Sequence, residues 1–596
     1  MTAAIFACRL GRTSRVVPIA GIAGVVFATV LTVRPELQRL AQNAARSPLL
    51  DEISSLDLGV MLAVAIGVVA AVAGVGYIMQ GTDGIKSRSR VVRGRSDNFG
   101  HADWLAIRDA QSLFPGPDAN YGGIVVGEAY RVDQDRTARL AFNPADKSTW
   151  GRGGTGPLLI DPCRSGSTHA LVFAGPGGFK TTSIGVPTML SWLGAAVVLD
   201  PSREICPMVQ TCREENLGHR VVTLDPSDPS AGAFNVLDWI DITAPEAETN
   251  IEAVVSWICG EPRGQFTSGA EFFRESGKAL IACLLTDMLW NAELPPAERT
   301  LKQLRRVLVT PENEMRELLE HIHADSASPL ARDLAGTLKG LVAETFSGIY
   351  GNAITDTRWL STTAYADLVS GNSFRSSELT EGRLTVFVQV PLKTLLATPA
   401  LGRVIVGALL NAAYEADGQV SGRILFLLDE VARLGTMRVL EQARDAGRKY
   451  GITLLLLYQS LGQLIGQWGH EGKQAWYDAT SWRLFAAVQD PDTAKELSAM
   501  CGEHAVIATA QGRSRGSHGS GGATNSSSGR SENRSEIRRA LIKPEEIIQD
   551  TRADEAFVLA RGSRPLRCGR AIYFRRTDMN RLVGANRFHP QRLAAE

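Results

Sequence analysis

Short apolar runs bounded by polar residues recur along the chain after about residue 165. Six of them have the length of a strand: "ALVFAG" (170–175), "AAVVLD" (195–200), "RVVTLD" (220–225), "RLTVFVQVP" (383–391), "RILFLLDE" (423–430) and "ITLLLLYQ" (452–459). Their apolar residues are consecutive, which is typical of strands that are buried on both faces of a parallel sheet. Helix-like segments follow two of these runs, at 181–192 and 437–449. The pattern therefore predicts an α/β domain with a parallel sheet.

The stretch 244–344 has a different pattern, because its apolar residues recur at helical spacing and it contains no strand-like run. Strand-like runs resume near Leu384, so we expect an all-α domain inserted into the α/β domain, which then comprises residues 96–243 and 345–596. Within the second part, residues 512–535 are rich in glycine and serine. They cannot bury a core, and we expect a flexible loop there.

The N-terminal part contains two uncharged apolar runs, 16–33 and 58–79. Each is long enough to cross the hydrocarbon core of a bilayer, about 30 Å, as a helix. Arginines precede the first run and basic residues follow the second, so the positive-inside rule places both ends in the cytoplasm. We expect a membrane anchor over residues 1–95 with the bulk of the chain cytoplasmic. An alternative is a cleaved signal peptide that ends near "AQNAA" (41–45), which leaves the later residues on the same side.

Composition narrows the possibilities. The 596 residues exceed what one hydrophobic core normally organises, so we expect two or more domains. The chain has 63 basic and 63 acidic residues, so bulk charge gives no support to nucleic-acid binding, although a local basic surface is compatible with it. The eight cysteines form no CxxC pair and no zinc-like cluster, which is typical of reduced thiols in the cytoplasm.

The segment "AGPGGFKTTS" (174–183) predicts a phosphate-binding loop between a strand and a helix. Gly175, Gly177 and Gly178 allow backbone N–H groups to turn inward, Lys180 supplies positive charge, and the Thr181 hydroxyl can face Mg²⁺. The loop departs from the usual pattern because Phe179 stands where glycine normally precedes the lysine, and an alanine replaces the first glycine. The alternative is a glycine-rich turn with an incidental lysine.

The run "RILFLLDE" ends in Asp429 and Glu430. In P-loop ATPases an aspartate at this position holds Mg²⁺, and a following glutamate can orient the attacking water. A strand that ends in two acids is common by itself. The loop and the acidic pair together, in this order, predict a site for ATP and Mg²⁺.

The next strand-like run ends in Gln459, where ATPases of the RecA type place a polar sensor of the γ-phosphate. Arg448 lies in the segment before that run and could reach the ATP of a neighbouring subunit as an arginine finger. The alternative for this arginine is a solvated basic helix face.

Taken together, these segments resemble the coupling ATPases of conjugation and type IV secretion, in particular the TraG-like branch. The resemblance covers nearly the whole chain. It is carried by the phosphate loop and by "FGHADWLA" (99–106), "VVLDPSRE" (197–204), "AFNVLD" (233–238), "TFSGIYGNA" (345–353), "LLDEVARLG" (427–435), "GRKYGITLLLLYQS" (447–460) and "ALIKPEEI" (540–547). The chain departs from the family at Phe179 and in "DPSRE", which lacks a lysine that many members carry.

The resemblance implies a RecA-like P-loop NTPase domain that works as a ring hexamer at the bacterial inner membrane. It implies an inserted all-α domain that docks relaxase or effector cargo. The family's site residues then correspond to Lys180, Thr181 and Thr182 in the loop, to the acidic pair, to Arg448 as a trans-acting arginine and to Gln459 as a sensor.

These observations favour a membrane-anchored ATPase that delivers cargo to a type IV secretion channel. Its partners would be further copies of itself, the relaxase, the channel components and single-stranded DNA held without sequence preference. Two alternatives stay open. One is a chromosome-segregation DNA translocase, which usually has more membrane spans and a terminal DNA-reading domain. The other is a docking receptor that binds nucleotide but hydrolyses little, a possibility that Phe179 keeps open.

Overall fold

The computed structural model describes residues 92–588 except 95, 97, 262–267 and 521–522. The two predicted membrane spans, 16–33 and 58–79, lie outside these residues. Among the helices that are described, none is long and apolar enough to cross a bilayer.

A mixed sheet of eleven strands organises the described α/β part, in the order β3-β2-β16-β15-β12-β4-β11-β10-β5-β9-β6. Seven consecutive strands of this order are parallel: β12 (Trp482–Ala486), β4 (Ala170–Ala174), β11 (Ile452–Tyr458), β10 (Ile424–Asp429), β5 (Ala196–Leu199), β9 (Leu384–Val388) and β6 (Arg220–Leu224). The six predicted strand-length runs form six of the seven, which confirms the predicted α/β domain with parallel strands.

Four antiparallel strands extend the sheet beyond β12: β15 (Glu555–Ala560), β16 (Leu566–Gly569), β2 (Ile124–Glu128) and β3 (Leu158–Asp161). The sheet is therefore mixed, where the sequence predicted a parallel one. The loop 561–565 between β15 and β16 is too short for the crossover that parallel neighbours need, so these two strands pair antiparallel.

Helices cover both faces of the sheet, which explains why its strands are apolar throughout. Along β4, Leu171 belongs to one core cluster and Val172 to another. The first cluster includes residues of α15 (Pro399–Glu415) and α16 (Arg438–Ala446), and the second includes residues of α5 (Val186–Ser191) and α6 (Ile205–Thr211). Further helices are α4 (Ile107–Leu113), α14 (Leu392–Ala397), α17 (Leu461–Ala479), α18 (Pro491–Cys501), α19 (Pro544–Asp550) and α20 (Thr577–Asn580).

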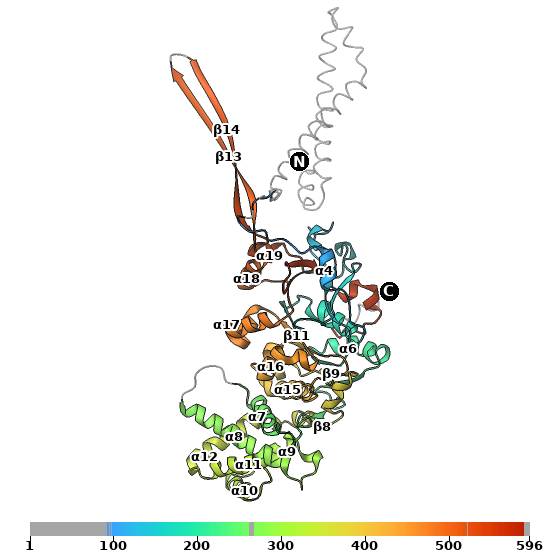
Figure 1. Cartoon of the computed structure of the whole chain (residues 1–596), viewed down its shortest axis with the longest axis vertical. Helices are drawn as coiled ribbons and strands as arrows, with labels where there is room; N and C mark the ends of the chain where they lie inside the picture. The colour runs from blue at the N-terminus through green and yellow to red at the C-terminus, as the bar shows by residue number, and fades with distance from the viewer. Residues whose placement is uncertain (1–91, 95, 97, 262–267, 521–522, 589–596) are drawn as a thin grey trace, which may run out of the picture. The chain divides into compact units, whose positions relative to one another are not determined.

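The predicted helical segment is helical, and its helices gather together in Figure 1. They are α7 (Ala247–Cys259), α8 (Ser268–Trp290), α9 (Leu301–Leu308), α10 (Glu312–Asp325), α11 (Pro329–Lys339), α12 (Ala343–Thr357) and α13 (Thr363–Leu368). The segment extends past the predicted boundary at residue 344, because Phe346, Ile349 and Ala353 bury one face of α12. Just outside it, β7 (Phe234–Asn235) pairs with β8 (Ser370–Asn372), so its entry and exit lie side by side.

Residues 512–520 and 523–535 do not form the predicted loop. They belong to two strands of a hairpin, β13 (Glu503–Ser520) and β14 (Ala523–Ala540), and β1 (Val92–Arg93) pairs with β13 (Figure 1). The prediction was wrong because it considered only whether the side chains could form a core. A hairpin satisfies its backbone N–H and C=O groups between its own two strands, whatever its composition. The described residues within 506–537 form a compact unit together with residues 92–94, and the remaining described residues form a second unit.

Candidate functional site

The predicted phosphate loop joins β4 to a helix, as expected. A π-helical turn over Thr181–Gly185 begins this helix and α5 continues it. Gly177 has a φ of 68°, in the left-handed region that favours glycine. A Cβ atom on Gly178 would lie 2.7 Å from the carbonyl oxygen of Gly175, which itself accepts a hydrogen bond from Gly178 N. The loop's path therefore requires glycine at 177 for its backbone angles and at 178 for space.

Phe179 also has a left-handed backbone, with a φ of 53°. A non-glycine residue in this conformation costs about 1–2 kcal/mol. Its carbonyl oxygen accepts two hydrogen bonds from Ser183, from the backbone N at 2.9 Å and from Oγ at 2.8 Å. Phe179 thus adopts the left-handed conformation that glycine adopts easily. Replacing glycine by phenylalanine therefore preserves the turn of the loop but raises its conformational energy.

The acidic pair lies opposite the loop. Asp429 is the last residue of β10, and its Oδ1 lies 3.6 Å from Lys180 Nζ. Glu430 Oε1 lies 3.3 Å from the same nitrogen. Strands β4 and β10 are separated only by β11 and run parallel, so their carboxyl ends meet at one edge of the sheet. The structure thereby brings together residues that are 250 positions apart in the sequence.

Burial dominates the electrostatics of this pair. It raises the pKa of Asp429 to about 6, and the neighbouring Lys180 partly offsets this effect. Glu430 and Asp200 raise the same pKa further by charge repulsion. The ionised form of Asp429 is therefore disfavoured at this edge of the sheet, and an added cation would stabilise it.

Gln459 completes the cluster from the end of β11. Its Nε2 donates a hydrogen bond of 2.7 Å to Glu430 Oε1, and its backbone N donates to Gln463 Oε1 at 2.9 Å. Lys180 and Gln459 therefore share one carboxylate oxygen of Glu430. Glu430 itself has a left-handed backbone with a φ of 54°, which is uncommon for glutamate and frequent at functional sites.

Arg448 does not belong to this cluster within one chain. It is exposed in the 3₁₀ turn Gly447–Tyr450, at the start of β11, whereas Gln459 follows the end of that strand. The seven residues of β11 separate the two by about 20 Å along the strand direction. Thr181 and Thr182, by contrast, are half-buried and follow Lys180 directly.

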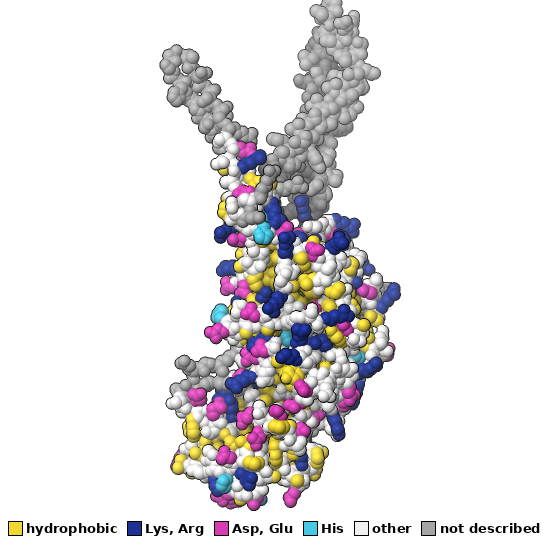
Figure 2. Space-filling view, viewed as in Figure 1, with side chains coloured by type: hydrophobic (Ala, Val, Ile, Leu, Met, Phe, Trp, Pro, Cys, Tyr) yellow, Lys and Arg dark blue, Asp and Glu magenta, His cyan; other side chains and the backbone are white. Residues whose placement is uncertain are grey.

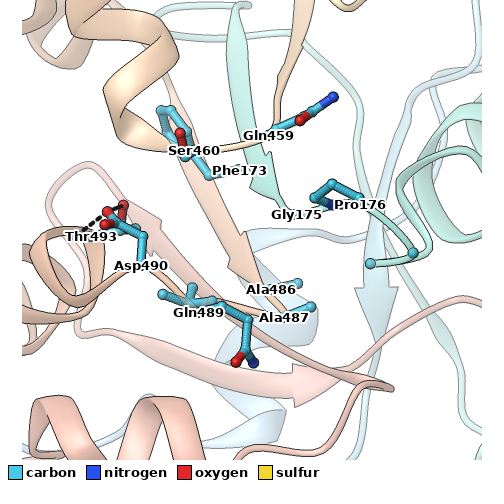
Figure 3. A pocket seen from close by; sticks show the side chains of 13 residues that line it. Phe173, Gly175, Pro176, Gln459, Ser460, Ala486, Ala487, Gln489, Asp490 and Thr493 are labelled. Atoms are coloured by element: carbon cyan, nitrogen blue, oxygen red, sulfur yellow. Dashed lines mark hydrogen bonds between the residues drawn. The ribbon is translucent and has the colours of Figure 1, made fainter.

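An open pocket of about 410 Å³ adjoins the loop, at the carboxyl ends of β4, β11 and β12. Gly175, Pro176 and Gln459 face it from two of these strand ends, and Ala487 and Asp490 face it from the segment after β12 (Figure 3). The side chain of Asp490 caps α18 by accepting hydrogen bonds from Thr493 N and Oγ1. The size of the pocket and its location at the ends of parallel strands are typical of ligand pockets. The wall formed by residues 486–490 carries no motif that sequence reasoning could have found.

The residues present fit a nucleotide with Mg²⁺. Glycine-dependent backbone, Lys180 and a helix start suit phosphate groups. The Thr181 hydroxyl and the Asp429 carboxylate are hard oxygen donors of the kind Mg²⁺ prefers. Among the described residues, no three or more histidine, cysteine, aspartate or glutamate side chains form a group that could hold a metal. Mg²⁺ at phosphate sites is usually bound by one or two protein oxygens together with substrate phosphates and water.

Two residues near the loop were missed by the sequence analysis. Phe142 and Arg570 both contact the ring of Phe179, although neither is near it in the sequence. No local motif marks either residue, and only the antiparallel extension of the sheet brings the arginine to the loop.

Comparisons with known proteins identify the family. The family model described as type IV secretory system conjugative DNA transfer matches residues 112–596. The conjugal transfer protein TraG of Rhizobium radiobacter is 44% identical over 506 residues, which cover 85% of this chain and 77% of that protein. The type IV secretion system-coupling protein VirD4 of Bartonella quintana is 44% identical over 507 residues, 84% of this chain and 77% of that protein. The predicted family resemblance is confirmed.

Solved structures agree on the fold. The plasmid coupling protein TrwB in complex with ADP and Mg²⁺ superposes with a TM-score of 0.50 at 16% identity, over 77% of this chain and 96% of that chain. At this identity the likeness concerns the fold alone, and it supports the predicted RecA-like P-loop domain.

Proposed function

The chain belongs to the type IV secretory system conjugative DNA transfer family, and we propose that it is a coupling protein driven by ATP hydrolysis. The observation that carries the ATP-dependent part is the meeting of Lys180, Glu430 and Gln459 at one edge of the sheet, next to the glycine loop. A lysine, a carboxylate and a polar amide at this position are the groups that P-loop ATPases use. TrwB, which has the same fold, has been solved with ADP and Mg²⁺.

The proposed site works as follows. Backbone N–H groups of the loop and Lys180 would bind the phosphates. Thr181 and Asp429 would hold Mg²⁺, which would supply positive charge beside the phosphates. Thr182 follows in the same helical turn and would contact a phosphate. Glu430 orients the attacking water, and Gln459 responds to the presence of the γ-phosphate through its hydrogen bond with Glu430.

Lys180 must change partners when nucleotide binds. Its Nζ is now near two carboxylates, and a phosphate would replace them as the counter-charge. Loss of the lysine contact would then free Glu430 Oε1 for water while Gln459 still holds it. The contact between Lys180 and Glu430 would thus keep the water-orienting carboxylate occupied until a phosphate arrives.

Assembly is part of the proposal. Arg448 is too far from the site of its own chain, so any role on ATP would be exerted on a neighbouring subunit, as in a homo-hexameric ring. We further propose an anchor in the bacterial inner membrane through residues 16–33 and 58–79, with the rest of the chain cytoplasmic.

Cargo and DNA belong to the proposal as well. The helices α7–α13 would dock relaxase or effector proteins on the way to the channel components. On the face shown in Figure 2, basic and acidic side chains are interspersed. Contact with single-stranded DNA would therefore rest on local basic groups, without sequence preference.

One alternative is favoured by a specific observation. The left-handed Phe179 is strained where glycine would not be, and a receptor that binds nucleotide without turnover could tolerate such a loop. The family match leaves less room for a chromosome-segregation translocase.

ATP turnover of the full chain, measured with and without single-stranded DNA, tests the proposal. Wild type would be compared with Lys180→Ala, Glu430→Gln and, as a matched acid outside the site, Glu496→Gln. DNA-stimulated turnover that is lost in the first two variants and kept in the third is the expected result. Tight nucleotide binding with no turnover in any condition would instead establish the receptor.

A further inference from the structure

The ring of Phe179 contacts two side chains from distant parts of the chain. The rings of Phe142 and Phe179 form a T-shaped pair, with their centroids 5.7 Å apart and their planes at 78°. The guanidinium carbon of Arg570 lies 6.0 Å from the centroid of the Phe179 ring. Both arrangements are attractive, because an aromatic edge and a cation each favour the electron-rich face of a ring.

The same arginine also supports the backbone of Phe179. Arg570 Nε donates a hydrogen bond of 3.0 Å to Ser183 Oγ, and that hydroxyl in turn donates to the Phe179 carbonyl oxygen at 2.8 Å. Arg570 therefore acts on both parts of the strained residue, on its ring directly and on its carbonyl group through Ser183.

Arg570 is not explained as an ordinary structural arginine. It is 1% exposed, its Nη1 donates to the Ala553 carbonyl, and its Nη2 has no hydrogen-bond partner among the described residues. Arg213 is equally buried, but its guanidinium is fully engaged, with carbonyl groups of the α5 region and with Thr385. An unpartnered buried donor is uncommon in folded proteins, and the guanidinium of Arg570 instead lies against the Phe179 ring.

Phe142 also contacts an arginine. It is half-buried, and the guanidinium carbon of Arg575 lies 5.2 Å from the centroid of its ring. Arg575 in turn donates a hydrogen bond to the carbonyl oxygen of Arg570. The two contacts on Phe179 are therefore parts of one connected cluster rather than two independent neighbours.

We propose that Arg570 and Phe142 are positioning residues that hold the Phe179 loop in the conformation which glycine adopts unaided, and so make a phosphate loop without that glycine able to bind nucleotide. The inference rests on the proposed nucleotide site. It assigns the segment after β16 a role in ATP binding that is exerted through the loop residues Phe179 and Ser183.

A double-mutant cycle tests the proposal in the full chain. The four proteins are wild type, Arg570→Met, Phe179→Gly and the double variant, and the measurements are the Kd of a fluorescent ADP with Mg²⁺ and the midpoint of thermal unfolding without nucleotide. Arg570→Met should weaken binding about tenfold in the wild-type loop and less than about threefold in the Phe179→Gly loop, because glycine needs no support. Arg213→Met is the control, and its effects should be the same in both loops.

The outcomes distinguish the proposed support of the Phe179 loop by Arg570 and Phe142, which we call the clamp, from the proposed nucleotide binding. Equal effects of Arg570→Met in both loops, in Kd and in the unfolding midpoint, would overturn the clamp. If wild type binds no nucleotide, the proposed function fails, and coupling between positions 179 and 570 in the unfolding midpoint alone decides about the clamp. If Arg570→Met does not fold, the half-buried Phe142→Leu replaces it in the same cycle, with suppression by Phe179→Gly again expected.

Discussion

Gln459 Nε2 donates a hydrogen bond to Glu430 Oε1 across the carboxyl ends of two adjacent parallel strands. The same oxygen is 3.3 Å from Lys180 Nζ. A single carboxylate oxygen thus contacts the residue proposed to bind phosphate and the residue proposed to sense it. Mutation of Gln459 alone therefore tests the proposed sensing role separately from phosphate binding by Lys180.

Gln459→Ala should lower ATP turnover roughly 10²-fold and leave nucleotide affinity nearly unchanged, because an oriented polar group acts mainly on the transition state. The measurements are kcat and the Kd for ADP. Gln474→Ala, on the exposed part of α17, is the control and should leave both unchanged. A parallel loss of affinity in Gln459→Ala would mean that the amide only supports the loop.

Two of the three glycines of the loop, Gly177 and Gly178, should respond differently to substitution. A Cβ atom at Gly178 meets the Gly175 carbonyl oxygen at 2.7 Å, so Gly178→Ala must displace the backbone. A Cβ atom at Gly177 meets no atom within 4 Å, and only its φ of 68° disfavours a side chain. We therefore expect Gly178→Ala to abolish binding of fluorescent ADP. Gly177→Asn, which tolerates the left-handed region, should weaken it only a few-fold. The reverse order would show that the loop changes its path when nucleotide binds.

Acid should destabilise the fold through His169, which lies next to β4, the strand that leads into the phosphate loop. His169 precedes β4, and its Nδ1 accepts a hydrogen bond from Leu454 N at 3.1 Å, so the ring nitrogen must be unprotonated. Burial lowers the pKa of His169 to about 4 from its ordinary 6.5. Between these two pKa values only the unfolded chain binds the proton. The contribution of His169 to the free energy of unfolding is therefore fully present above pH 6.5 and falls as the pH decreases toward 4.

For this one group the free energy of unfolding should fall by about 2 kcal/mol between pH 7 and pH 5. Urea unfolding at the two pH values measures it. His169→Gln can still accept the hydrogen bond through its side-chain oxygen and does not titrate, so its loss over this range should be smaller by about that amount. An equal loss in both proteins would place the acid sensitivity elsewhere.

The central strands could be predicted because burial on both faces leaves a direct trace, as in the uninterrupted apolar residues of β10 and β11. The antiparallel extension left a weaker trace. β2 contains Gly127, where a Cβ atom would meet the Gly569 carbonyl oxygen at 2.6 Å, and a strand interrupted by glycine is hard to recognise from its pattern. The hairpin of β13 and β14 was missed because backbone pairing does not depend on apolar content.

The site divides in the same way. Lys180, Asp429, Glu430 and Gln459 could be predicted because each lies at the end of a recognisable parallel strand or in the loop after it, and such ends share an edge. Phe142 and Arg570 could not, since their contacts with the loop depend on packing across the antiparallel strands. The hydrogen bond from Arg570 to Ser183 joins residues that are 387 positions apart in the sequence. Phe179 was the one signal, because a bulky residue in a glycine position requires neighbours that support it.

Arg448 allows a test of assembly. It is exposed at the opposite end of β11 from Gln459, so it can serve an ATP site only in a neighbouring subunit. Arg448→Ala should therefore abolish turnover in oligomers while nucleotide binding is kept. Arg438→Ala, an exposed arginine on α16, is the matched control and should be fully active.

Mixing two inactive variants distinguishes a trans role from a local one. Lys180→Ala has a defective site and an intact arginine, and Arg448→Ala has the reverse. In randomly mixed rings about a quarter of the interfaces combine an intact site with an intact arginine, so turnover should reappear at up to about that fraction of wild type. If Arg448 acted within its own chain, every subunit would carry one defect. Turnover that stays absent in mixtures verified to contain both variants would therefore contradict the trans role.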